Sequence, residues 1–214
     1  MDILTKLADQ ALRQPPPRGT GRYHYVHTQG WYLATAQTTS GRVLDSRIEP
    51  TDREFWVAED GSGRIAETRD GRPSRMSGTY EPPGLLGEFV TGDSVDALQA
   101  TLLRRNPTRS PQGWLKLTQE LWTRQVVSPA LHAAVLRILA AQPELSQDGP
   151  VTDRVGRPGV AVSAQSTPAE RYVLTLDPGT GGFLGFEQIA PGPAGAGCTV
   201  WRDSGYVPDT TTRP

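Results

Sequence analysis

Short stretches of alternating apolar and polar residues, separated by glycine-containing turns, recur along this chain and constrain its fold more than any other feature. The clearest example spans residues 171–187, where a period-two segment ends at Leu176 and a second one begins at Phe183. The Asp-Pro-Gly-Thr-Gly sequence between them supplies the positive φ angles that a hairpin connection needs. Closely spaced strands joined by such turns pair antiparallel.

Helical patterns lie before and between two groups of strands. An amphipathic helix is predicted over residues 3–12. Three more helices are predicted between Ser94 and Gln142, of which the third begins at Ser128-Pro129, a cap followed by a first-turn proline. The predicted strands are residues 23–28, 31–35, 42–48, 53–58 and 64–68, and a second set from Gly149 onward. The pair 23–28 and 31–35 is expected to turn at Gln29-Gly30, and residues 73–92 to form an irregular connection.

This order predicts an α+β fold: a curved antiparallel β-sheet, a half-barrel-like meander, with an N-terminal helix and a central helical segment packed on one face. At 214 residues, the length favours one domain over two. We expect a single α+β domain over residues 1–207 and a disordered tail over residues 208–214.

The charge and hydropathy of the chain exclude some classes of partner. The formal net charge is -1, so no overall positive field attracts nucleic acid. No apolar run has the length of a membrane span and no signal peptide precedes Ile3, so we expect the chain as given to be soluble.

The residues that most often carry catalysis or bind metals do not form a known pattern. His24 and His27 are three apart in a predicted strand and therefore point to opposite faces. His132 lies beside the apolar stripe of its helix, and Cys198 stands alone in an apolar strand. We therefore expect no catalytic residue, no metal site and no cofactor, and we do not expect an enzyme.

Two glycine-rich turns resemble ligand loops only at first sight. The glycines from Gly179 to Gly185 follow a strand, but the sixth position of the dinucleotide pattern is Leu184 and another strand follows. The loops at Asp60 and Asp177 offer one carboxylate each, too few for calcium. Both aspartates are expected to bond their own turns.

The predicted helices between Ala97 and Val127 are basic and contain Trp114 and Trp122. Glu120 is their one acidic residue between those positions, and the basic residues are Arg104, Arg105, Arg109, Lys116 and Arg124. Such a pair of helices could meet an acidic partner or lipid headgroups. The favoured interpretation is a solvated face over a core anchored by tryptophan.

Aromatic residues of the predicted sheet are the candidates for a binding site. If the sheet curves, its concave side could form an apolar groove for a lipid-like ligand. The same residue types also pack ordinary cores, and the sequence leaves both interpretations open. The groove candidates are Tyr25, Trp31, Phe55, Trp56 and Trp201.

Several segments, taken in order, resemble the extracytoplasmic part of an actinobacterial membrane-anchored family of unknown function. The likeness covers about residues 3–207, and its main segments are residues 21–26, 53–64, 128–135, 152–162 and 176–181. Members of that family carry a short cytoplasmic piece and one membrane span, and are often encoded beside an extracytoplasmic-function sigma factor. The order of elements also resembles the half-barrels of lipoprotein carriers and RseB-type periplasmic regulators.

The resemblance implies a non-enzymatic extracytoplasmic sensory or regulatory domain of a bacterial envelope protein. Its partner would be another protein or a lipid-like ligand, and membrane attachment would come through an anchor absent from this chain. One alternative is a carrier that holds a lipid or other apolar ligand between sheet and helices; another is a hydrolase or transferase with an unrecognised site. The expected location is the extracytoplasmic face of the cell membrane, with the cytoplasm as the alternative.

Overall fold

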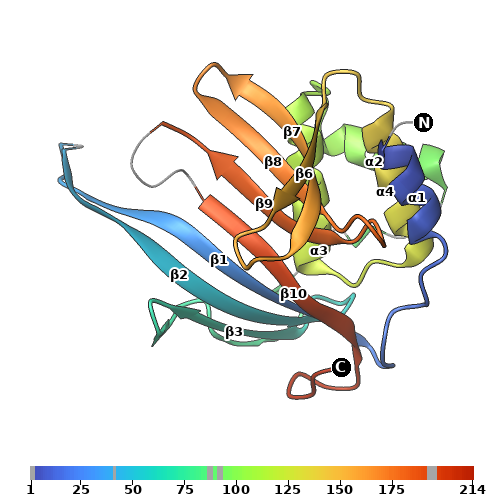
Figure 1. Ribbon diagram of the computed structural model, residues 1–214. Coiled ribbons are helices and arrows are strands. Elements are labelled where there is room, and N and C mark those ends of the chain that lie inside the picture. Colours follow the sequence, from blue (N-terminus) through green and yellow to red (C-terminus); the bar gives the residue numbers. More distant parts are fainter. Residues whose placement is uncertain (1–2, 41, 86–88, 91–93, 192–196) are drawn as a thin grey trace.

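Both groups of strands join one open, curved antiparallel sheet, as the sequence predicts (Figure 1). The computed structural model describes residues 3–40, 42–85, 89–90, 94–191 and 197–214. In these residues the strand order is β4-β3-β2-β1-β10-β9-β8-β7-β6, and the short β5 also pairs with β3. The strands are β1 (Tyr23–Gln37), β2 (Val43–Val57), β3 (Gly63–Arg69), β4 (Arg72–Pro73), β5 (Gly78–Tyr80), β6 (Ser146–Thr152), β7 (Pro158–Thr167), β8 (Glu170–Leu176), β9 (Phe183–Ile189) and β10 (Gly197–Val207).

The described helices are α1 (Ile3–Ala11), α2 (Val95–Arg105), α3 (Pro111–Arg124) and α4 (Pro129–Ala140). Of these, α2 and α4 begin directly after the serine caps that the sequence predicts. The hydroxyl of Ser94 accepts a hydrogen bond from the Ala97 amide at 3.5 Å, and that of Ser128 accepts one from the Leu131 amide at 3.2 Å. Prolines open α3 and α4, where a missing N–H costs nothing.

The helices lie on one face of the sheet, which we call the helix face (Figure 1). α3 packs on β7, β8, β9 and β1, while α1 and α2 pack against α4. The main core fills the space between these helices and strands β7–β9, and Trp114, Leu115, Leu136, Val162 and Leu174 are among its most buried members. Among the described residues, no helix combines the length and the apolar character that crossing a membrane requires.

The turn expected at Gln29-Gly30 is wrong, because β1 continues through both residues. Gly30 pairs with Thr51 on one side and with Thr199 on the other. A Cβ atom at Gly30 would come within 2.4 Å of Cε2 of Tyr32, so glycine here clears space for a neighbouring ring rather than turning the chain. A glycine inside a strand often marks such a close approach.

Other boundaries also differ from those expected. β2 runs without a break through Pro50, although the sequence suggests two separate strands. The region 73–92, expected to be irregular, contributes β5 to the sheet, and β6 precedes the strand expected at Gly159. The expected turn at Ser40-Gly41 includes Gly41, which lies outside the described residues. The turns at Asp60 and Asp70 are confirmed and lead into and out of β3.

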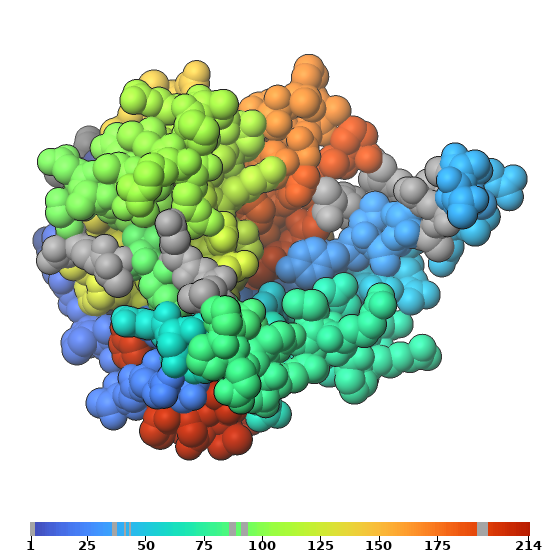
Figure 2. Space-filling view, turned by 180° about the vertical axis from the view of Figure 1, so that it is seen from behind, coloured from blue at the N-terminus to red at the C-terminus, as the bar shows by residue number. Residues whose placement is uncertain are grey.

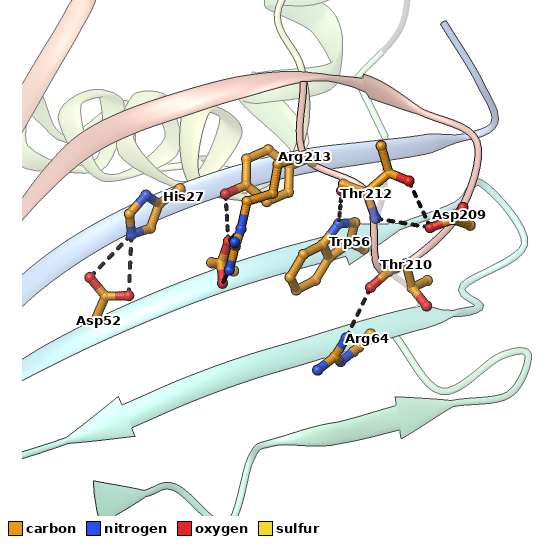
Figure 3. A network of polar contacts seen from close by, with 10 residues as sticks. His27, Asp52, Trp56, Arg64, Asp209, Thr210, Thr212 and Arg213 are labelled. Carbon is orange, nitrogen blue, oxygen red and sulfur yellow. Dashed lines mark hydrogen bonds and ion pairs between the residues drawn. The ribbon is translucent and has the colours of Figure 1, made fainter. Parts of the chain in front are cut away.

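Residues 208–214 are not a disordered tail but lie against the face of β1, β2 and β3 opposite the helices, which we call the tail face (Figure 3). The indole N–H of Trp56 donates to the Thr212 carbonyl at 2.8 Å, and the guanidinium of Arg64 donates to the Thr210 carbonyl at 3.2 Å. Asp209 accepts hydrogen bonds from the amides of Thr211 and Thr212 and so shapes the turn. The polar composition of this segment suggests disorder. The contacts that order it are with residues about 150 positions away, and no local pattern reveals them.

Deleting residues 209–214 is expected to destabilise the protein by on the order of 2 kcal/mol, because Trp56 and Tyr25 lose their cover. Thermal unfolding monitored by circular dichroism should show a lower Tm, and the tryptophan emission of the folded variant should shift to the red. As a control, Arg213→Ala removes the ion pair with Glu54 and leaves the rest of the segment in place; its Tm should fall less than that of the deletion. An unchanged Tm after the deletion would contradict the packing described above.

Candidate functional site

A pocket of about 860 Å³ opens on the helix face, where β1 begins, β2 turns into β3, and α4 starts. Its walls come from five parts of the chain that are separate in sequence: residues 21–24, 58–60, 89–90, 125–131 and Tyr206. The lining residues include His24, Asp60, Phe89, Val126, Leu131 and Tyr206. Pockets of this size hold small-molecule ligands in many proteins.

His24 forms one wall of the pocket and is fixed by a hydrogen bond. The amide N–H of Val126 donates to its Nδ1 at 3.1 Å, so in the neutral ring the proton is on Nε2. The imidazole contacts the rings of Phe89 and Tyr206, at centroid distances of 4.7 and 5.0 Å. Burial lowers the pKa of His24 to about 4, so this wall is uncharged at neutral pH.

The rim of the pocket carries charges that the β2–β3 turn holds in place. Arg22 donates to Asp60 at 2.7 Å and to the Ser62 hydroxyl at 3.1 Å. Asp60 also accepts hydrogen bonds from the Ser62 amide and hydroxyl. Hydrogen bonds from Ser62, and then from Arg22, lower the pKa of Asp60. The carboxylate is thus bound within its own turn, as the sequence predicts.

Gln125 fastens another wall of the pocket to the end of α3. Its side-chain Oε1 accepts from the Val90 amide and its Nε2 donates to the Val90 carbonyl, both at 2.8 Å. The buried amide therefore pairs with one residue in the way that a neighbouring strand would. Val90 is thereby held against the end of α3, while the neighbouring Phe89 packs against the sheet residues Phe55, Val57 and Ile65.

The five groove candidates do not line one groove. Tyr25 and Trp56 meet on the tail face, with ring centroids 5.2 Å apart, and both are buried beside Val207. Phe55 lies on the helix face in a separate cluster with Val57 and Ile65. Trp201 packs at the margin of the main core, and Trp31 is half-buried beneath the guanidinium of Arg154. The pairing of strands that are distant in sequence decides on which face each ring lies, and no local sequence pattern predicts that pairing.

The other titratable candidates are also far from one another. His27 bonds Asp52 on the tail face, opposite His24, as its odd spacing predicts. His132 is buried and contacts the Gly181 carbonyl at 2.8 Å. Burial raises the pKa of Cys198 to about 12, with Glu187 adding to the effect. Within the described ranges, no three His, Cys, Asp or Glu side chains meet as a metal site.

Trp114 and Trp122 belong to the core, so the basic helices are anchored by tryptophan from below. Only 2% and 6% of their surfaces are exposed. Trp122 also meets the edge of His132, at a centroid distance of 4.9 Å. The basic side chains remain on the outer surface, where Arg105 and Arg124 both reach Glu120.

Sequence reasoning missed the pocket itself. His24 was visible as one of three histidines, but its partner Val126 lies 102 residues further along the chain. The one local signal near the pocket is the cap at Ser128. It predicts the start of α4, and that start lines the pocket.

No protein-family model and no curated protein matches this chain. Among solved structures, the chain is similar to MucB, at 15% identity over 100% of this chain and 59% of MucB, with a TM-score of 0.33. The complex of MucA and MucB from Pseudomonas aeruginosa gives 14% identity, 98% and 60% coverage, and a TM-score of 0.34. A DUF1329 family protein from Desulfovibrio piger gives 13% identity, 96% and 94% coverage, and a TM-score of 0.26.

This chain spans about three fifths of the length of the MucB chains. At this level of superposition, the likeness concerns the fold at most and assigns no activity.

Acid is expected to destabilise the protein through His132. Burial lowers its pKa to about 4, although the contact with Gly181 opposes the shift. The folded pKa lies below the unfolded value of 6.5, so this contribution to stability is complete above pH 6.5 and is lost as the pH falls toward 4. The loss is about 3 kcal/mol. Urea unfolding at pH 7 and pH 4 measures it.

In the same experiment, His132→Gln keeps a donor for the Gly181 carbonyl but cannot take up a proton. Its free energy of unfolding should therefore fall less between the two pH values than that of the wild type. An identical fall in both proteins would show that His132 does not carry the acid sensitivity.

Proposed function

We propose that this chain is a non-enzymatic regulatory domain of the bacterial envelope that responds to a ligand bound in the pocket between β1 and α4. The observation that carries the proposal is the pocket itself, with a volume of about 860 Å³ and half-buried rings of His24, Phe89 and Tyr206 in its wall. Concave sites with apolar and aromatic walls and a few fixed polar groups are typical of small-molecule binding.

The polar groups around the pocket suit binding better than catalysis. His24 is neutral, and its Nδ1 is occupied by the Val126 amide. Asp60 is engaged by Arg22 and Ser62, so it is ionised and already hydrogen-bonded. A general base needs a free lone pair and a pKa near the working pH, and neither group offers both.

The construction of the pocket supports a regulatory role. Its walls include the start of β1, the end of β10, the first turn of α4 and the segment held by Gln125. A ligand that touches all four parts favours the arrangement in which they are closed around it. The envelope location rests on the sequence resemblance to the membrane-anchored family.

The carrier alternative uses the same pocket. The space between helices and β7–β9 is filled by the main core, so a lipid-like ligand would occupy the pocket at its margin. Val90, Val126 and Leu131 give that pocket an apolar floor. Native mass spectrometry of the freshly purified protein separates the two: a retained lipid supports a carrier, and a retained polar metabolite or an empty pocket contradicts it.

Ala130→Trp is expected to block the pocket, because Ala130 lines it from the first turn of α4. We use the fluorescent probe 1-anilinonaphthalene-8-sulfonate, whose aromatic rings suit the apolar wall. The variant should raise the dissociation constant of the probe at least fivefold, measured by fluorescence titration.

The matched control is Ala100→Trp, which adds the same ring on the exposed side of α2. It should leave the dissociation constant unchanged within a factor of two, and circular dichroism should show both variants folded. Equal binding by the wild type and Ala130→Trp would reject the pocket as a ligand site.

A further inference from the structure

A second concave surface lies on the helix face, between α3 and the strands β1, β2 and β3. We call it the trough. In Figure 2, strand β10 is recessed between α3 and β1 in this region. One end is a pocket of about 360 Å³, lined by Tyr32, Lys116, Gln119, Glu120, Phe186 and Gln188 among others. The trough does not share a lining residue with the pocket at His24.

Arg53 on β2 lies in the trough, and one of its N–H donors has no hydrogen-bond acceptor. Its Nε is buried and has no hydrogen-bond partner. The nearest carboxylate, on Glu67, is 3.9 Å from that nitrogen, which is beyond hydrogen-bond distance, and it already accepts from Arg69 at 2.9 Å. The guanidinium is instead held over the ring of Phe55, at 5.1 Å from its centroid. A buried donor without a partner costs free energy that a ligand can recover.

Arg124, at the end of α3, is paired with Glu120 and is near enough to Arg53 to act on its charge. Arg53 interacts electrostatically with Arg124 and Arg69, which disfavour its charge, and with Glu67 and Tyr32, which favour it. Two guanidinium groups that repel each other across a gap are both stabilised by an anion between them. Arginine presents a planar fork that matches the two oxygens of a carboxylate.

Positive charge is in excess around the trough. The carboxylates around it are Glu67, near Arg53 and Arg69, Glu120, shared by Arg105 and Arg124, and Glu170, which accepts a hydrogen bond from Gln188 and interacts with Lys116. Glu49 lies opposite Tyr32 on β2 but is paired with Arg47 at 2.9 Å. Lys116 adds a further cation, positioned 4.4 Å from the centroid of the Tyr172 ring. The charge complement of this surface is therefore an acidic ligand.

Tyr32 provides a platform beside these cations. Its ring lies across the backbone of β1 and β10, where Gly30 and Gly197 leave room for it. The hydroxyl is hydrogen-bonded to the Thr199 hydroxyl at 2.7 Å, yet 42% of the residue is exposed. An immobilised, exposed aromatic ring offers contact area at little cost in conformational entropy.

We propose that the trough binds an acidic peptide segment of a partner protein, with one carboxylate between Arg53 and Arg124 and the chain lying over Tyr32. A small anion would use only the arginine end. The trough continues past Tyr32 to Gln119 and to Gln188, whose Nε2 already donates to Glu170 and to the Tyr172 hydroxyl, and this length suits a polypeptide better than a small anion. This site is separate from the ligand pocket and does not depend on it.

The test is a titration of the ¹⁵N-labelled protein with acetylated, amidated hexaglutamate at pH 6 and low salt, followed by NMR. The Nε–H resonance of Arg53 should shift on binding, because that donor gains an acceptor. The glutamine hexapeptide of equal length should bind at least tenfold more weakly. No shift at Arg53, or equal binding of both peptides, would overturn the proposal.

Variants locate the binding surface. Arg53→Gln should raise the dissociation constant for hexaglutamate at least tenfold. Arg124→Gln should raise it about fivefold, and because this side chain is 53% exposed the variant is expected to fold even if Arg53→Gln does not. Arg104→Gln removes an equal charge from the exposed side of α2 and should change the constant less than twofold. Equal losses in all three variants would contradict a specific site.

Two further probes distinguish other sources of anionic groups. Inorganic phosphate and vesicles containing phosphatidylglycerol are titrated in the same way. If either shifts the Arg53 resonance while hexaglutamate does not, the occupant is not an acidic peptide and the proposal fails. If hexaglutamate alone shifts it, the proposal is supported.

Discussion

The ladder between β1 and β10 holds the molecule together, because among the described strands it is the one pairing that joins the first group to the second. It pairs Tyr23 with Val207 and Tyr32 with Gly197, residues separated by most of the chain. Ordering so long a loop before any contact is gained is slow and costly in entropy. The described pocket and trough both border this ladder: Tyr206 of β10 and His24 of β1 meet in one, and Thr199 and Tyr32 in the other.

Local signals in the sequence were sufficient for the fold class and for most of its elements. Ser94 and Ser128 marked the starts of helices because a cap acts within one turn, and the alternation at Tyr172–Leu176 marked a strand for a similar reason. Gly30 led to a wrong prediction of a turn, because glycine occurs both in turns and inside strands where another group lies close to the backbone. What decides between them is the ring of Tyr32 and the strands on either side, and strand neighbours are set by the whole fold.

The candidate sites were harder to predict than the fold. Each is made by contacts between distant segments: His24 with Val126 in the pocket, and Arg53 with Arg124 in the trough. Trp56 and Tyr25, two of the groove candidates, are covered by residues 208–214. The composition of residues 208–214 alone predicts no structure for that segment. The residue types in the sequence identify side chains that could bind a ligand. Which of these side chains a ligand can reach depends on how deeply each is buried and on which other residues cover it.

The junction between α3 and the connection that follows it links the two surfaces. Arg124 acts electrostatically on Arg53 in the trough. Gln125, the next residue, forms two hydrogen bonds with Val90 in the wall of the pocket. A rotation of this last turn that brought Arg124 toward an anion would also pull on the segment that Gln125 holds. Any free energy that couples the two sites through this turn must act equally in both directions, so that a ligand in the pocket and a peptide in the trough would each change the affinity for the other by the same factor.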